Sequence, residues 1–417
     1  MESITANFGQ LKKQVLRLRP PDSAQDDISK VDQPHDTQAN GYDSRMTVRR
    51  RSSLLFFYVT IWLAAGWSRA QDVTSGPWVM QSSGTKAGLR GIHAVGGGVA
   101  WASGTSGTVL RTEDSGYMWQ SCAMPPGAEK LDFRGIWAWD ENTAVVMSSG
   151  PGDQSRLYKT TDGCSSWKLL YTNPVKDGFW DAMVFSDRKN GFVLGDPVNG
   201  SFVLLRTEDG GATWKPIKSA DLSAGGQKRG VFAASNSSMV LTGPVLGQVW
   251  APWFGTGGPG GALVYQGGID CTMGIAHSDP EECLKHWTFD RGKVPVAGES
   301  ASAGMFSLAR RDDQHWMAVG GDYSKPEEPA GTAAWTADDG AHWTVAEKSP
   351  HGYRSAVAWD ADDKAWIVVG TNGSDVSYDD GKTWSRLDDG KWNALSLPWV
   401  VGPEGRIAKL GALPARK

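Results

Sequence analysis

Short runs of alternating apolar and polar residues recur along this chain, separated by turns rich in glycine. Leu89–Ala94, Phe133–Ala138 and Trp180–Phe185 each open a group of such runs. The alternation has the period of β-strands, and short runs between glycine-rich turns are typical of antiparallel meander sheets. The pattern predicts an all-β chain built from repeated four-stranded units.

An eight-residue motif closes five of these groups. It reads Ser/Thr-x-Asp-x-Gly-x-x-Trp, except that Cys164 occupies the glycine position in the second copy. The tryptophans that end the motif are Trp119, Trp167, Trp214, Trp343 and Trp384, at spacings of 48, 47, 129 and 41 residues. Repeats of this period indicate a propeller in which each short spacing is one blade and the long spacing covers two.

We expect the aspartates of this motif to hold a turn rather than to perform chemistry. They are Asp114, Asp162, Asp209, Asp338 and Asp379. A carboxylate in a tight hairpin accepts hydrogen bonds from turn amides, and glycine supplies the positive φ that the turn needs. The tryptophan then fills the space between neighbouring sheets. Turns on separate blades do not bring carboxylates together, so neither a metal site nor a catalytic residue is expected among them.

Seven blades of four strands account for residues 75–412. Blade four is expected to start at Arg229 and to carry an insertion at about 247–290. The last blade finds only three strands near the C-terminus, and Trp78–Gln81 is available as its fourth. A sheet shared between the N- and C-terminal strands closes the ring and removes an exposed edge.

Residues 46–70 have the order of a secretory signal peptide. Arg49–Arg51 precede the apolar stretch Leu54–Ala65, and Ser68 and Ala70 provide small residues at the cleavage site. About a dozen apolar residues are too few to span a bilayer, which needs ~20. We therefore expect export, with a periplasmic or secreted product that has no stable membrane insertion after cleavage.

Composition changes this picture little. The chain has 417 residues, 52 of them Gly and 21 Trp, and its net charge of −4 argues against nucleic acid as a partner. Residues 1–45 are polar and without periodicity, so they are expected to be disordered or to precede the true start at Met46. Neither zinc-type cysteine and histidine spacing nor a phosphate-binding loop is present, so we expect no metal and no cofactor.

Export makes the four cysteines candidates for disulfides. Cys271 and Cys283 lie 12 residues apart in one segment rich in Gly, Asp and Pro, and we expect them to pair. Cys122 and Cys164 are then left to join neighbouring repeats.

The candidate binding surface lies at the starts of the first strands. Aligning these strands places four arginines in one register, Arg90, Arg134, Arg229 and Arg354. Trp180 takes the same place in blade three, and Asp196 lies on a loop of the same face. Because arginine binds carboxylates in bidentate fashion, this set predicts an anion site for a partner. Alternatively, each arginine pairs with a nearby carboxylate such as Asp181, Asp196 or Glu299 and only stiffens the rim.

The chain resembles the photosystem II stability/assembly factor family. The resemblance rests on the Arg-Gly-Ile/Val first strands, the Thr-x-Asp-Gly-Gly-x-Thr-Trp turn, a Leu-Gly-Asp-Pro segment and a terminal Val-Gly-Pro-Glu-Gly strand, and it covers about 75–410. It implies a seven-bladed propeller with Asp-box (BNR) repeats, which acts as a non-catalytic chaperone with an arginine patch on one face. The four aligned arginines are the positions that match this patch.

The sequence thus favours an exported, non-catalytic propeller that binds a protein or peptide partner. The alternative on the same repeats is a sialidase-like glycosyl hydrolase, which needs an arginine triad, a tyrosine nucleophile with a glutamate, and an acid aspartate. Tyr353, Tyr323 and Glu299 are the nearest candidates for that chemistry. An oxidoreductase is disfavoured because nucleotide-binding and haem motifs are missing from the sequence.

Overall fold

A computed structural model describes residues 76–226, 228–245, 249–270, 283 and 285–416. All of them belong to one compact unit, residues 71–417. The expected signal peptide at 46–70 and the segment 1–45 lie outside the described residues. Within the described ranges, none of the helices combines the length and the apolar character needed to cross a bilayer.

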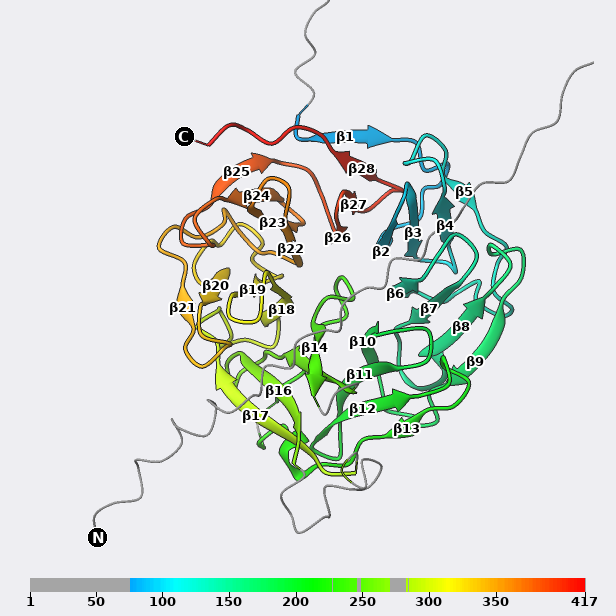
Figure 1. Cartoon of the computed structure of the whole chain (residues 1–417), viewed down its shortest axis with the longest axis horizontal. Helices are drawn as coiled ribbons and strands as arrows, with labels where there is room; N and C mark the ends of the chain where they lie inside the picture. Colours follow the sequence, from blue (N-terminus) through cyan, green and yellow to red (C-terminus); the bar gives the residue numbers. More distant parts are fainter. Residues whose placement is uncertain (1–75, 227, 246–248, 271–282, 284, 417) are drawn as a thin grey trace, which may run out of the picture. The chain divides into compact units, whose positions relative to one another are not determined.

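The described chain forms seven antiparallel sheets of four strands each, as predicted (Figure 1). Blade one is β2 (Leu89–Gly96), β3 (Val99–Gly104), β4 (Val109–Thr112) and β5 (Gln120–Ser121). Blade two is β6 (Phe133–Ala138), β7 (Ala144–Ser148), β8 (Arg156–Thr160) and β9 (Lys168–Thr172). Blade three is β10 (Trp180–Phe185), β11 (Gly191–Val198), β12 (Ser201–Thr207) and β13 (Lys215–Pro216). Blade four is β14 (Met239–Val245), β15 (Val249–Gly255), β16 (Leu263–Ile269) and β17 (Trp287–Lys293).

The remaining blades follow the same order. Blade five is β18 (Ala303–Arg310), β19 (Trp316–Asp322), β20 (Ala333–Thr336) and β21 (Thr344–Val345). Blade six is β22 (Ala356–Asp360), β23 (Ala365–Gly370), β24 (Gly373–Ser377) and β25 (Ser385–Asp388). Blade seven is β26 (Ala394–Ser396), β27 (Trp399–Val401), β28 (Ile407–Leu410) and β1 (Trp78–Gln81).

The ring closes through the two ends of the described chain. Each first strand contacts the first strand of the next blade, and β26 of blade seven contacts β2 of blade one. The fourth strand of blade seven is β1, which pairs with β28 from Trp78↔Leu410 to Gln81↔Ile407. The predicted sharing of one sheet between N- and C-terminal strands is therefore confirmed (Figure 1).

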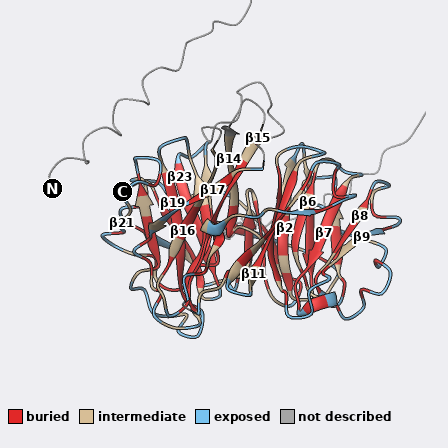
Figure 2. Cartoon of the chain, turned by 90° about the horizontal axis from the view of Figure 1, so that it is seen from below, coloured by how far each residue is buried: buried red, intermediate tan, exposed pale blue. Residues whose placement is uncertain are grey.

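The two faces of the ring carry different connections. In blade one, Leu89 pairs with Gly104, so the start of the first strand and the turn after the second strand lie on one face. We call this the first-strand face. Ser115 in the repeated motif donates its N–H to Gly98 O, so the motif turns lie on the opposite, repeat-turn face. In side view the buried residues lie along the strands, while exposed residues gather in the turns of both faces (Figure 2).

The five repeat turns share one set of hydrogen bonds. In blade three, Thr207 Oγ1 donates to Asp209 Oδ1 (2.9 Å) and accepts from Gly211 N (2.9 Å). Asp209 Oδ1 also accepts from Thr213 N (2.8 Å). The same bonds form at Thr112 with Asp114, Thr160 with Asp162, Thr336 with Asp338 and Ser377 with Asp379. Each carboxylate is therefore occupied by its own turn.

Apolar side chains fill the spaces between neighbouring blades. Between blades two and three, Val145, Trp180, Val193 and Trp214 belong to one buried cluster. Trp180 and Trp214 come from the first strand and the repeat turn of blade three. Burial of two large aromatic rings per blade explains why tryptophan is so frequent in this chain.

Blade four differs from the prediction. Its first strand begins at Met239 and not at Arg229, while Gly230 forms only an isolated bridge to Gly257. The segment expected to be an insertion, 247–290, supplies β15, β16 and the start of β17. Blade four lacks the Ser/Thr-x-Asp-x-Gly-x-x-Trp motif, so its outer strands had no marker in the sequence.

The expected link between neighbouring repeats is present. Cys122, just after β5, forms a disulfide with Cys164 in the repeat turn of blade two. Cys164 has a φ of 64°, the left-handed conformation that glycine adopts at this position in the other turns. Cys271 lies outside the described residues, so its pairing with Cys283 stays a prediction.

Candidate functional site

Two of the four predicted arginines meet on one carboxylate at the first-strand face. Arg90 Nε lies 3.0 Å from Asp132 Oδ1, and Arg134 Nε lies 2.9 Å from Asp132 Oδ2. Arg90 and Arg134 stand at the starts of β2 and β6, and Asp132 directly precedes β6. The three side chains form what we call the arginine pair of blades one and two.

The arginine pair carries more positive than negative charge. Burial lowers the pKa of Arg90, Asp132 raises it and the neighbouring Arg134 lowers it, but a guanidinium stays protonated near neutral pH. The side chains of Arg90 and Arg134 are 33% and 28% exposed. A partner carboxylate that reaches this point therefore meets two guanidinium groups that share one internal acid.

A segment of the chain itself fills the middle of the ring. Residues 233–238 precede β14 and leave the blade-four sheet, and this connection reaches the centre of the ring in Figure 1. We call it the central segment. Asn236 donates Nδ2 to Met183 O (2.9 Å) and accepts from Met183 N at Oδ1 (2.8 Å). Ser235 Oγ donates to Ser355 O (2.7 Å), so blades three and six are bound to the same few residues.

The central segment also uses one of the predicted binding residues. Arg134 Nη1 donates to Ala233 O at 3.0 Å. On the far side, Ser237 Oγ lies 2.7 Å from Ser307 Oγ of blade five. Nη1 of Arg134 therefore makes a structural hydrogen bond within the fold. The Nη atoms of Arg90 have no hydrogen bond among the described residues.

Two carboxyl groups lie beside the central segment, half-buried Asp196 and buried Asp181. Asp196 Oδ1 accepts from Val231 N at 3.0 Å, just before the segment begins. Burial raises the pKa of Asp196, and the bond from Val231 opposes this. Asp181 is 1% exposed, and its Oδ2 has no hydrogen bond in the described chain. Burial raises the pKa of Asp181 well above its ordinary value, Asp196 adds to this and Arg134 opposes it.

Four aromatic rings lie across the ring from the arginine pair. Phe232 stacks on Phe306 with 3.9 Å between centroids, and Tyr323 and Tyr353 contact Phe306 edge-on. Tyr323 is 54% exposed, so its ring offers an apolar surface on the first-strand face. Burial raises the pKa of Tyr353 far above its ordinary value, and the neighbouring Tyr323 adds to this.

Arg229 does not join the arginine pair. Its guanidinium donates to the carbonyl oxygens of Ala224, Gly260 and Gly261. Gly260 and Gly261 line a cavity of about 920 Å³ between blades four and five. Arg229 therefore shapes one wall of this cavity.

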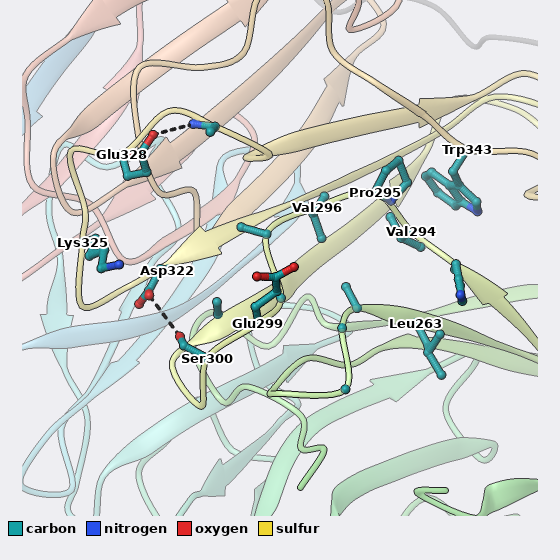
Figure 3. A pocket seen from close by; sticks show the side chains of 18 residues that line it. Leu263, Val294, Pro295, Val296, Glu299, Ser300, Asp322, Lys325, Glu328 and Trp343 are labelled. Atoms are coloured by element: carbon teal, nitrogen blue, oxygen red, sulfur yellow. Dashed lines mark hydrogen bonds between the residues drawn. The ribbon is translucent and has the colours of Figure 1, made fainter. Parts of the chain in front are cut away.

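The cavity combines an apolar wall with carboxylates (Figure 3). Val294, Pro295 and Val296 of the β17–β18 connection form part of its lining, and Glu299 extends into the middle of the view. Asp322 accepts from Ser300 Oγ at 3.0 Å. Burial favours the neutral form of Asp322, but bonds from Ser324, Ser302 and Ser300 lower its pKa to about 2.

Arg354 and Trp180 lie in the interior. Arg354 is 0% exposed, and its Nε donates to Asp375 Oδ2 at 2.9 Å while Nη1 donates to Asn372 Oδ1 at 2.6 Å. Trp180 is 1% exposed and stacks on Tyr171 with 5.7 Å between centroids. Neither side chain is open to a partner at the rim, so the two carry no part of the site described above.

The residues proposed for a sialidase-like reaction do not converge. Of the four aligned arginines, only Arg90 and Arg134 share a partner in the described chain. Tyr353 is buried with a strongly raised pKa, the opposite of what a nucleophile needs. Within the described ranges no group of three or more His, Cys, Asp or Glu side chains is placed to hold a metal ion.

The sequence reasoning missed Asp132 and the central segment. Asp132 stands two residues before Arg134, and this spacing puts both side chains on the same side of a strand. The run Ser235–Ser238 interrupts the apolar pattern of the first strand with four polar residues. Both features were visible in the sequence as local patterns, but their partners in other blades were not.

No protein-family model and no curated protein matches this chain. Among solved structures it is similar to "YCF48 bound to D1 peptide", with 14% identity and a TM-score of 0.51 over 81% of this chain and 97% of that chain. The WD40 propeller domain of Doa1 has a TM-score of 0.51 at 9% identity, over 81% of this chain and 97% of that chain. YCF48 from Cyanidioschyzon merolae shares 15% identity over 80% of this chain and 98% of that chain, with a TM-score of 0.38.

These likenesses show the fold. The neighbours include the photosystem II assembly factor YCF48, in agreement with the resemblance read from the sequence. The WD40 propeller of Doa1 has the same TM-score of 0.51 as the YCF48 structure, and the two are 9% and 14% identical to this chain. The feature that all three share is therefore the propeller architecture.

Proposed function

We propose that this chain is an exported, non-catalytic propeller that binds a protein or peptide segment on its first-strand face. The observation that carries the proposal is the sharing of Asp132 by Arg90 and Arg134. One carboxylate between two partly exposed guanidinium groups leaves a local excess of positive charge. An acidic side chain or a C-terminal carboxylate is the group that such a pair recognises.

Other features of the first-strand face favour a peptide over a free ion as the ligand. Tyr323 offers an exposed ring beside Phe232, and the cavity between blades four and five adds an apolar wall. A similar propeller, YCF48, has been solved with a D1 peptide bound. That precedent supports a role of the assembly-factor kind, in which the propeller holds a segment of another protein without changing it.

Export is part of the proposal and rests on residues 46–70 alone. A cleaved signal peptide before the propeller places the partner in the periplasm or outside the cell. Sequencing the N-terminus of secreted material tests this step, and a mature chain that still contains Leu54–Ala65 would contradict it.

A peptide titration tests the binding site. Wild-type protein is screened against acetylated hexapeptides that each carry one acidic group, and the best binder is titrated against variants. We expect Arg90→Gln and Arg134→Gln each to weaken binding at least tenfold, and wild-type binding to weaken with salt. Arg188→Gln, which removes an exposed arginine paired with Asp140, is the matched control and should leave affinity unchanged.

Equal affinities of the Arg90, Arg134 and Arg188 variants would refute an anion site at the arginine pair. The Arg134 variant also removes the bond to Ala233 O, so its melting temperature is measured alongside. Arg90→Gln avoids this complication, because only its contact with Asp132 is lost.

A further inference from the structure

A second cavity, between blades three and four, has a strongly positive lining. Its volume is about 510 Å³, and it is bounded by β12, β13, the residues that follow β13 and the start of β17. It shares none of its described lining residues with the cavity between blades four and five or with the arginine pair. The inference below therefore does not depend on the proposed function.

Cationic side chains outnumber carboxylates in the described lining of this cavity. The cations are Arg206, Lys215, Lys218 and Lys285, and the carboxylate is Glu208. The three lysines are exposed, so a ligand can reach their ammonium groups from solvent. A cleft lined mainly by one sign of charge attracts ions of the opposite sign, so this cavity favours an anion.

Glu208 joins two of these cations. Arg206 Nη2 lies 3.0 Å from Glu208 Oε1, and Lys215 Nζ lies 3.8 Å from Glu208 Oε2. Arg206 and Lys215 are also direct neighbours across the β12–β13 ladder, where like charges repel each other. Because both cations contact the same carboxylate, one anionic headgroup at this point can reach both of them.

Lys218 adds a positive charge that the described chain does not neutralise. Its ammonium group makes neither a hydrogen bond nor an ion pair with any described residue. Even without Lys285, three cations therefore face one carboxylate, an excess of two positive charges. Lysine ammonium groups act as compact point charges and are common ligands of phosphate oxygens. A tetrahedral anion with two negative charges matches this lining.

An apolar wall lies beside the charged groups. Pro216 and Ile217 line the cavity from blade three, and Trp287 lines it from blade four. The guanidinium of Arg206 lies over the Trp287 ring, 5.9 Å from its centroid, which fixes the position of this cation. Burial lowers the pKa of Arg206 and Glu208 raises it, but a guanidinium stays protonated near neutral pH. The wall offers contact area to the body of a ligand as well as to its headgroup.

We infer that this cavity binds a phosphate ester, a doubly charged headgroup attached to a small apolar body. The headgroup meets Arg206, Lys215 and Lys218, and the body packs on Pro216 and Ile217. The volume lies within the range of small-molecule sites. A free aryl phosphate and a phosphorylated tyrosine side chain of a peptide share this chemistry.

Calorimetric titration of the full chain tests the inference at about pH 7.5, where a phosphate ester carries close to two charges. The probes are phenyl phosphate, which has two charges and a ring, benzoate, which has the ring and one charge, and inorganic phosphate, which has no ring. Acetyl-Ala-phosphotyrosine-Ala-amide carries the same group within a peptide. Saturation by phenyl phosphate alone or by the peptide alone identifies the source of the ligand, and either result supports the site.

We expect one of the two phosphate esters to bind at least tenfold more tightly than benzoate and inorganic phosphate. Lys215→Gln and Lys218→Gln should each weaken binding of that ester about tenfold, because each removes a charge that faces the headgroup. Glu208→Gln should strengthen binding, because it removes the carboxylate that repels the ligand. Lys168→Gln is the matched control, since Lys168 is the corresponding exposed residue at the start of β9 in blade two but does not line this cavity.

Equal binding of the esters, benzoate and inorganic phosphate, or equal affinities of the Lys218 and Lys168 variants, would overturn the inference. The same holds if neither ester saturates, or if Glu208→Gln weakens binding. Loss of binding in Arg90→Gln would also contradict the site, because it would place the anion at the arginine pair. All the lysines that are changed are exposed, so a melting curve of each variant should match that of the wild type.

Discussion

Asn236 holds the backbone of Met183 with both ends of its side-chain amide, at 2.8 Å and 2.9 Å. The two residues belong to blades four and three, and they meet at the middle of the ring rather than along a sheet. Asn236 adopts a φ of 63°, a left-handed conformation that an asparagine tolerates better than most residues. The central segment is therefore built around this contact.

The first prediction concerns the stability that this contact provides. Asn236→Ala removes the acceptor of Met183 N and the donor to Met183 O, so two buried backbone groups lose their partners. We expect a loss of about 2–4 kcal/mol in the free energy of unfolding, measured by urea denaturation. Asn199→Ala is the control, since Asn199 also has a positive φ, 52°, but lies in an exposed turn. This variant should lose only the free energy that alanine costs in a left-handed backbone conformation. Equal losses in the two variants would show that the contact with Met183 contributes nothing.

The repeat turns provide a second prediction. Asp209→Ala leaves the N–H of Thr213 and the hydroxyl of Thr207 without their acceptor, which should cost about 1–3 kcal/mol. Trp214→Ala should cost about 3–5 kcal/mol, because it removes a buried aromatic ring. Thermal melting compares the two with Asp209→Asn, which keeps an acceptor oxygen. Unchanged melting temperatures would mean that the turns do not stabilise the blades.

Cys122 and Cys164 allow a prediction with an internal control. Both Cys122→Ala and Cys164→Gly remove the disulfide, whose sequence separation of 42 residues corresponds to about 4 kcal/mol in the chain-entropy account. Cys164→Gly also relieves a left-handed residue at the position where other repeats have glycine, which recovers about 1 kcal/mol. Under oxidising conditions Cys164→Gly should thus melt above Cys122→Ala. The reverse order would contradict the turn assignment at Cys164.

Buried Asp181 predicts the pH dependence of stability. Its pKa in the folded chain is raised above 3.8, so the folded state holds this proton more tightly than the unfolded state. Any stabilisation from the protonated form is complete below about pH 4 and is lost as pH rises through the raised pKa. Asp181→Asn should therefore raise the urea midpoint at pH 7 and change it little at pH 4.

Asp187 is the matched control for this experiment. Burial favours its neutral form, but bonds from Asn190 and Lys189 lower its pKa below the ordinary value. Asp187→Asn should therefore lose stability at pH 7, opposite in sign to Asp181→Asn. A decrease at pH 7 in both variants would mean that Asp181 is stabilising in its ionised form.

Much of the architecture was predictable because it depends on local signals. The first strands β6 and β10 begin and end where the alternation of apolar residues predicts, and Trp78–Gln81 completes blade seven as expected. Blade four was misplaced because residues 233–238 interrupt its first strand. A segment that leaves its sheet to bind four other blades has no periodicity of its own in the sequence.

The arginine site was predictable only in part, because it depends on contacts between residues far apart in the sequence. Register alone places Arg90, Arg134 and Arg354 at equivalent positions, but it does not tell which guanidinium groups find an internal partner. Arg354 is enclosed by His351, Asn372 and Asp375, residues of the same blade that the strand pattern did not connect with it. The difference between a rim arginine and a buried one arises from these tertiary contacts.

Hydrogen exchange with a bound peptide tests the central claim, that the first-strand face holds a protein segment, most directly. The peptide is the tightest binder from the acidic hexapeptide screen, and exchange is read by mass spectrometry with and without it. We predict slower exchange at residues 130–136 and in the β19–β20 connection around Tyr323, with no change in the five repeat turns. Protection confined to the repeat turns, with residues 130–136 unaffected, would contradict the account.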